Sequence, residues 1–124
     1  MEHAVSAYYP NVAHGCGLTM LSVSYFTCLA ERNPARFPDL AGAMGENLDG
    51  IPEKDRSMAF ITGLKKLIKN VGLEEEKLSD FGIEQSQLRT FAENSFYTMG
   101  SLYDITPVKL TLDDVIAIYE NAYS

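Results

Sequence analysis

The stretch from Ala4 to Ala30 contains no charged residue, and this feature constrains the fold more than any other. In its second half, Leu18, Leu21, Tyr25 and Leu29 recur at helical spacing, while other apolar residues cover the remaining faces. A helix that is apolar nearly all round lies either inside a soluble bundle or in a membrane. Hydroxyl, amide and imidazole side chains interrupt this stretch, so the sequence favours a buried helix at the centre of a bundle and argues against a membrane span.

The rest of the chain has the apolar spacing and the start and stop signals of helices. Apolar residues at helical spacing predict further helices within 34–44, 52–71 and 84–99, and from Thr111 onward. Gly45, Gly72 and Gly100 follow three of these segments as stop signals, and Thr111 is a good N-cap for the last one. Residues 102–110 alone have some β character, which Pro107 weakens. We therefore predict an all-α bundle of five or six helices, forming a single domain over residues 1–124.

Charge and cysteine content exclude several classes of protein. The chain has 10 Lys+Arg against 17 Asp+Glu, a net charge of -7, so it lacks the basic surface that nucleic acid or an anionic membrane requires. Cys16 and Cys28 would lie about 18 Å apart on one helix, too far for a disulfide. Two free thiols and the lack of a recognisable secretory signal are compatible with the reducing cytoplasm.

The candidate chemical groups are few. His3 and His14 are the two histidines, and from spacing alone each is more often a structural residue, since two imidazoles fall short of the three or four ligands of a zinc or iron site. Cys16 is placed where a helix should begin, so free backbone N–H groups could lower its pKa; the simpler interpretation is a small buried thiol. The acidic runs Glu74–Glu76 and Asp113–Asp114 fit a solvated loop and a helix N-terminus.

The first eighteen residues carry a family resemblance. The segment from His3 to Leu18, with His14 followed by Gly15 and Gly17, resembles the metal-binding stretch of iron-containing alcohol dehydrogenases. In that family a His-x-x-x-His pair precedes a short aromatic loop and a His-Gly step. Residues 36–45 and 110–119 resemble later helices of the same family. The resemblance covers the whole chain and corresponds to roughly the last third of a full enzyme, its C-terminal helical domain.

The resemblance implies specific roles. Enzymes of this family transfer hydride reversibly between an alcohol and NAD(P), with Fe(II) or sometimes Zn held by one Asp and three His. His14 matches the last of these metal ligands. His3 matches the second His of the pair, which lies near the nicotinamide and the reacting centre and serves catalysis and cofactor binding there. The first His of the pair would come four residues before His3, and the family's N-terminal nucleotide-binding domain has no counterpart in this chain.

These differences lead to the prediction that the polypeptide alone binds neither the metal nor NAD(P) and has no dehydrogenase activity, because one imidazole cannot define a metal site. Its expected partner is the missing nucleotide-binding domain. Two alternatives remain: a stand-alone helical interaction module without catalysis, and a non-catalytic metal-binding oligomer in which several copies contribute His3 and His14. We also predict self-association through an exposed apolar patch of Tyr8, Tyr9 and Val12.

Overall fold

The computed structural model describes residues 1–123, which contain six α-helices, four short 3₁₀ turns and no strand. The predicted all-α class and the number of helices are confirmed. The helices are α1 (Glu2–Tyr8), α2 (His14–Arg32), α3 (Phe37–Ala43), α4 (Arg56–Asn70), α5 (Leu88–Tyr103) and α6 (Leu112–Tyr123).

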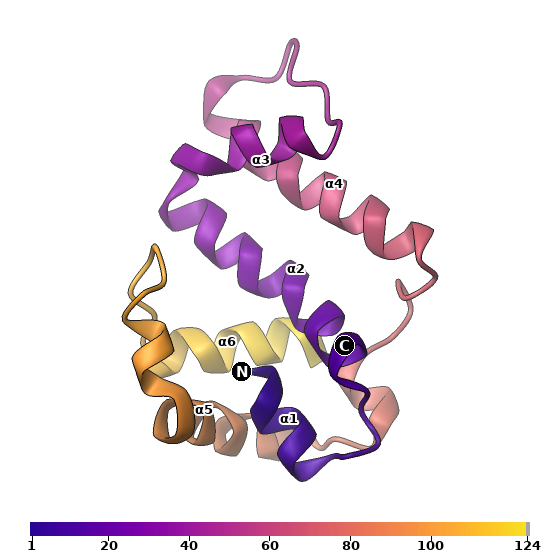
Figure 1. The fold of residues 1–124 in the computed structure, drawn as a ribbon, viewed down its shortest axis with the longest axis vertical. Helices are drawn as coiled ribbons and strands as arrows, with labels where there is room; N and C mark the ends of the chain where they lie inside the picture. The colour runs from indigo at the N-terminus through magenta and orange to yellow at the C-terminus, as the bar shows by residue number, and fades with distance from the viewer. Residues whose placement is uncertain (124) are drawn as a thin grey trace.

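The long helix α2 lies at the centre, as its uncharged sequence predicts. It contacts α1, α4 and α6, and in Figure 1 it runs diagonally between α3 and α4 on one side and α1, α5 and α6 on the other. Leu21 and Leu29 are buried along it. Leu18, which belongs to the same stripe, is 50% exposed, so the stripe is covered over most of its length and open at the N-terminal end of the helix.

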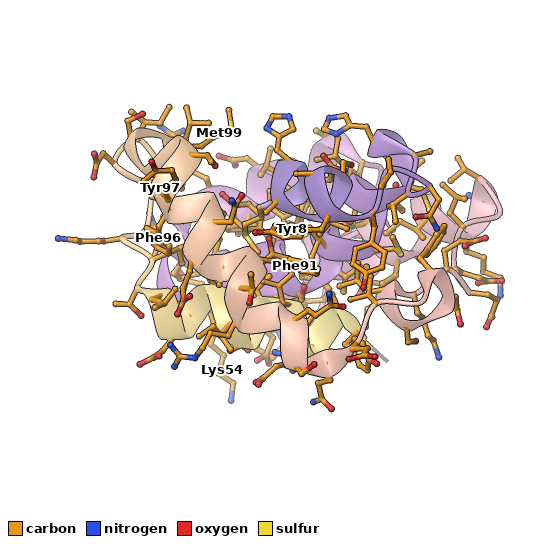
Figure 2. All side chains as sticks on the ribbon, turned by 90° about the horizontal axis from the view of Figure 1, so that it is seen from below. Tyr8, Lys54, Phe91, Phe96, Tyr97 and Met99 are labelled. Atoms are coloured by element: carbon orange, nitrogen blue, oxygen red, sulfur yellow. The ribbon has the colours of Figure 1, made fainter. Side chains whose placement is uncertain are left out.

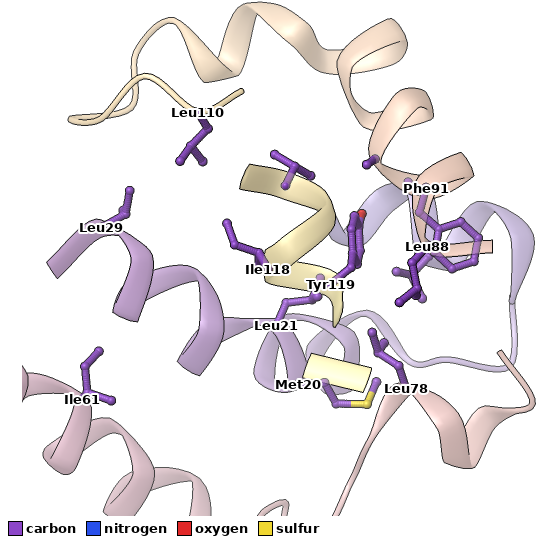
Figure 3. Packing of buried hydrophobic residues seen from close by; sticks show 14 of the residues in the cluster. Met20, Leu21, Leu29, Ile61, Leu78, Leu88, Phe91, Leu110, Ile118 and Tyr119 are labelled. Carbon is purple, nitrogen blue, oxygen red and sulfur yellow. The ribbon is translucent and has the colours of Figure 1, made fainter. Parts of the chain in front are cut away.

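The core is built where α2, α5 and α6 converge. Figure 3 shows Leu21 of α2 facing Ile118 and Tyr119 of α6, with Leu88 and Phe91 of α5 close by. All five side chains are buried. Burying apolar surface of this size supplies the main driving force for the bundle.

Helix ends follow the predicted signals in three places. Gly45 and Gly72 have φ values of 85° and 76°, a left-handed conformation that costs glycine little, and each lies just past a helix. Thr111 Oγ1 accepts a hydrogen bond from the backbone N–H of Asp114 at 3.2 Å, and Asp114 accepts one from the Thr111 N–H at 2.8 Å. This reciprocal pair is a capping box at the start of α6.

Other local predictions were wrong. Helix α5 continues through Gly100 to Tyr103, with a kink at Met99 (φ −139°, ψ 28°), so residues 102 and 103 are helical. The uncharged stretch contains a second, unpredicted helix, α1, separated from α2 by a turn at residues 9–13. Helix α1 is held by packing, because Ala4 and Val5 are buried against α2 and α5, and no pattern within this short segment shows those contacts.

The predicted apolar patch is also revised. Val12 is 2% exposed and belongs to the core. Tyr9 is half-buried and its hydroxyl donates to Oε1 of Gln87. Tyr8 remains half-exposed, so the three residues do not form one exposed patch, because the turn after α1 folds Val12 inward.

No helix within residues 1–123 is long and apolar enough to cross a membrane. Cys16 and Cys28 both lie on α2 and both are free thiols, as predicted.

Candidate functional site

The N-termini of α1 and α2 bring the two predicted site residues together. His3 lies in the first turn of α1 and His14 opens α2. Because α1 packs against α2, the two imidazole rings stack with their centroids 5.2 Å apart and their planes 15° from parallel. The turn at residues 9–13 thus converts a separation of eleven positions in sequence into direct contact.

Glu2 is a third member of this site that sequence reasoning missed. Its residue surface is 4% exposed, yet it is flanked by the two exposed histidines. Carboxylate Oε2 is in ion-pair contact with Nδ1 of His14, and Oε1 accepts a hydrogen bond from the hydroxyl of Ser6. The sequence offered one signal for Glu2: it is a charged residue directly before His3, at the edge of the uncharged stretch.

His3 contacts the kinked end of α5. Its Nδ1 lies 2.9 Å from Sδ of Met99, a weak acceptor. Figure 2 shows Met99 at the end of α5 remote from Phe91. The kink of α5 therefore occurs at the same residue that contacts His3.

A cavity of about 510 Å³ adjoins the two histidines. Its wall is mainly apolar and comes from α2 and the C-terminal part of α5. Burial raises the pKa of Tyr25 and of Tyr103, so both phenols stay protonated at neutral pH. The Tyr103 hydroxyl is 2.8 Å from Oγ of Ser95. The apolar and aromatic side chains along this wall are Leu18, Leu21, Tyr25, Phe26, Met99, Leu102 and Tyr103.

The donor set fits a divalent metal at the edge of this cavity. Glu2, His3 and His14 each offer one ligand atom, and these atoms lie within 4.8 Å of one another. With Nδ1 of His14 turned toward Glu2, its Nε2 is the nitrogen available to an ion. Imidazole nitrogen suits iron and zinc alike, so the ring is compatible with either metal.

The other candidate residues from the sequence lie outside this site. Burial, followed by the nearby Glu76, raises the pKa of the Cys16 thiol, which disfavours the thiolate, and the predicted buried thiol is only partly buried. Glu74 pairs with Lys69 at 3.4 Å. Asp114 lies in the first turn of α6, as predicted, and also pairs with Arg32.

The structure is an all-helical domain with two stacked histidines beside an apolar cavity, and comparison with known proteins identifies its family. Residues 1–123 match the Fe-containing alcohol dehydrogenase family, C-terminal. The chain belongs to this family and corresponds to its C-terminal domain, as the resemblance of its first eighteen residues indicated.

Relatives of the chain include a 1,3-propanediol dehydrogenase and a lactaldehyde reductase. The chain is 26% identical to 1,3-propanediol dehydrogenase of Klebsiella pneumoniae over 99% of its own length and 31% of that protein. It is 24% identical to lactaldehyde reductase of Escherichia coli (strain K12), with the same coverage of 99% and 31%. The chain therefore spans about a third of the length of these relatives.

Solved structures show the same fold. An alcohol dehydrogenase from an archaeal halo-thermophile of a Red Sea brine pool superposes with a TM-score of 0.84 at 25% identity, over 98% of this chain and 32% of that one. A 1,3-propanediol oxidoreductase superposes with a TM-score of 0.87 at 24% identity, over 98% and 31% of the two chains.

Proposed function

We propose that this chain forms the metal-binding wall of the active-site cleft in an iron-type, NAD(P)-linked alcohol dehydrogenase. The observation that carries the proposal is the cluster of Glu2, His3 and His14 at the mouth of an apolar cavity, within a chain that belongs to this family. In this role the chain acts on a small alcohol or aldehyde together with a nucleotide-binding domain.

His14 supplies Nε2 as one ligand of the divalent metal, Fe(II) or Zn. The metal, when bound, polarises the alcohol oxygen as a Lewis acid. His3, stacked against His14 at 5.2 Å, faces the nicotinamide and the reacting centre, where an imidazole positions substrate or carries a proton.

The cavity wall supports the same role. Tyr25, Phe26 and Leu102 present apolar surface next to the histidines. A wall of this kind excludes water from a reacting alcohol and holds its carbon chain. The open edge beside Leu18 is where we expect the nucleotide-binding domain to close the cleft.

In this role His14 is the single metal ligand from this chain, because His3 faces the nicotinamide, so the metal site within residues 1–123 is incomplete. A structural or catalytic ion needs three or four protein ligands, and hydride transfer needs the nicotinamide held against the substrate. We therefore infer that the 124-residue polypeptide, assayed alone, neither holds the metal and NAD(P) nor turns over. With two free cysteines on α2, the reducing cytoplasm is the compartment we propose.

The proposal is tested by anaerobic calorimetric titration of the polypeptide with Fe(II) and with Zn(II), using the wild type and His14→Ala. We expect weak, non-saturating heats that are unchanged in His14→Ala, and no NADH oxidation with a panel of aldehydes. The His3→Ala variant serves as a control that removes the neighbouring ring and leaves the ligand in place.

A second candidate has its own supporting observation. Because Glu2, His3 and His14 lie close together in one chain, a non-catalytic metal-binding function remains open. Saturable zinc binding by the polypeptide alone, abolished by His14→Ala and by His3→Ala together with Glu2→Gln, would replace the dehydrogenase proposal with this one. Saturable binding that is unchanged in His14→Ala would contradict both, because the ion would then bind elsewhere on the chain.

A further inference from the structure

We propose that Glu2 is a positioning residue that holds the His14 ring in one tautomer and one orientation, with Nδ1 protonated and Nε2 directed to the cleft. This inference rests on the proposed function, because the orientation of the His14 ring matters only if this ring binds the metal. It concerns a carboxylate that lies outside the set of one Asp and three His implied by the family resemblance.

The burial of Glu2 is the first observation. The side chain of Glu2 is 3% exposed, whereas that of His14 is 55% exposed. A buried carboxylate without a partner is costly, so such groups are retained where a specific neighbour stabilises them. Oε2 is buried and makes no geometrically regular hydrogen bond within residues 1–123. The group in contact with it is Nδ1 of His14.

The surroundings of Glu2 are shaped to hold it in place. Ser6, one turn along α1, donates its hydroxyl to Oε1. Gly17, in the first turns of α2, leaves the space that the carboxylate fills: a Cβ at this position would lie 2.8 Å from Oε1 and 2.9 Å from Cγ of Glu2. The absence of a side chain at residue 17 is thus a condition for the observed position of Glu2.

The physical consequence follows from imidazole chemistry. A neutral imidazole has one protonated nitrogen, and the hydrogen bond made by one nitrogen decides which is free to bind a metal. Carboxylates that accept from the second nitrogen of a ligand histidine fix the ring and increase its basicity, and their loss lowers metal affinity about 10–100-fold. Glu2 is placed to do this for His14.

A direct ligand role for Glu2 is the competing explanation, and the geometry disfavours it. The same Oε2 that would bind an ion is in contact with Nδ1 of His14. The two imidazole rings are exposed, whereas the carboxylate is buried beneath them. Because Oε2 is already in contact with the His14 ring, we expect Glu2 to orient this metal ligand and not to bind the metal itself.

The test is the tautomer of His14, read from long-range proton–nitrogen NMR spectra of the ¹⁵N-labelled polypeptide without metal, at a pH where the ring is neutral. We expect the Nδ1–H tautomer to predominate in the wild type. Glu2→Leu should release this restriction, and Glu2→Gln, which keeps a carbonyl acceptor of the same shape, should largely restore it.

A second pair of variants moves the carboxylate without changing its chemistry. Gly17→Ala should displace Glu2 and release the tautomer, whereas Gly15→Ala, where a Cβ meets nothing within 4 Å, should leave it unchanged. Both are glycine-to-alanine changes in the first turns of α2, so they match in helix propensity. Amide spectra establish that each variant is folded.

Two outcomes would overturn the inference: an Nε2–H tautomer in the wild type, or a tautomer that is the same in the wild type, Glu2→Leu and Gly17→Ala. Adding zinc to the same samples tests the proposed function separately. A fixed tautomer together with saturable zinc binding that leaves His14 Nε2 unshifted would confirm the positioning by Glu2 while contradicting the metal-ligand role.

Discussion

Tyr119 shows how one buried side chain joins distant parts of the chain. It is fully buried on α6, and its ring packs edge-on against Phe91 of α5 with centroids 6.0 Å apart. Its hydroxyl donates to the backbone carbonyl of Met1 at 2.7 Å. Burial raises the pKa of this phenol, so it stays a donor across the physiological range. This hydrogen bond thus joins the start of α1, which carries Glu2 and His3, to the core.

The substitution Tyr119→Phe should destabilise the protein by about 1 kcal/mol, because the Met1 carbonyl keeps the Ala4 N–H but loses the Tyr119 hydroxyl as a donor, while the ring packing is kept. Urea unfolding followed by circular dichroism measures the change in the free energy of unfolding. Tyr97→Phe is the matched control, since Tyr97 is 91% exposed. Equal stability of Tyr119→Phe and wild type would show that the hydroxyl contributes nothing.

At the scale of elements, the start of α6 is joined to the end of α2. Arg32 donates to both carboxylate oxygens of Asp114, while Asp114 and Thr111 form the capping box. The Arg32 guanidinium, together with the hydrogen bonds from Thr111, holds the pKa of Asp114 well below its ordinary value. The Asp114 carboxylate therefore caps α6 and also links α6 to α2. The pair Asp113–Asp114 in the sequence predicted the helix start but not the link to Arg32.

This linkage predicts a pH dependence. Because the pKa of Asp114 is lower in the folded than in the unfolded state, its stabilisation is present above about pH 4 and is lost as the pH falls through the folded value. Asp114→Asn should therefore reduce the unfolding free energy at pH 7, and the difference from wild type should shrink in strong acid. Thermal unfolding from pH 7 down to pH 2 measures this.

Asp113→Asn is the control for that series. Asp113 is exposed, lies in the same helical turn and forms no ion pair within residues 1–123. It should change stability little at any pH in the series. A pH profile of Asp114→Asn parallel to that of the wild type would refute the role assigned to the Arg32 pair.

At the scale of the whole molecule, the open cavity leaves apolar surface uncovered. Leu18 and Leu102 line its mouth and are each 50% exposed. In the proposed enzyme this surface faces the nucleotide-binding domain. Exposed apolar surface next to a cavity favours association. We therefore expect the isolated polypeptide to self-associate through Leu18 and Leu102, and not through Tyr8, Tyr9 and Val12.

Sedimentation velocity over a range of concentrations tests this expectation. The wild-type polypeptide should associate increasingly with concentration, and Leu18→Ser combined with Leu102→Ser should shift it toward the monomer. Leu67→Ser is a matched control, because Leu67 is also 50% exposed but lies on α4 outside the cavity wall. A wild type that remains monomeric throughout, or an equal effect of Leu67→Ser, would contradict the assignment.

Most of the helical architecture was predictable from residues close together in sequence. The apolar spacing along residues 18–30 identifies the central helix, and Gly45, Gly72 and Thr111 mark ends that the structure confirms. The segment around His3 and His14 was sufficient to indicate the family. Helix periodicity, caps and a short motif are all encoded within a few turns of chain, so they can be read without a fold.

The site itself depends on contacts between segments that no local pattern encodes. Burial of Glu2, its contact with His14 and the need for glycine at residue 17 exist because α1 folds back onto α2. The same packing buries Val12, and the kink of α5 at Met99 lies where this residue contacts His3. Each of these outcomes depends on which helix faces which, and that is settled by the burial of apolar surface over the whole bundle rather than by neighbours in sequence.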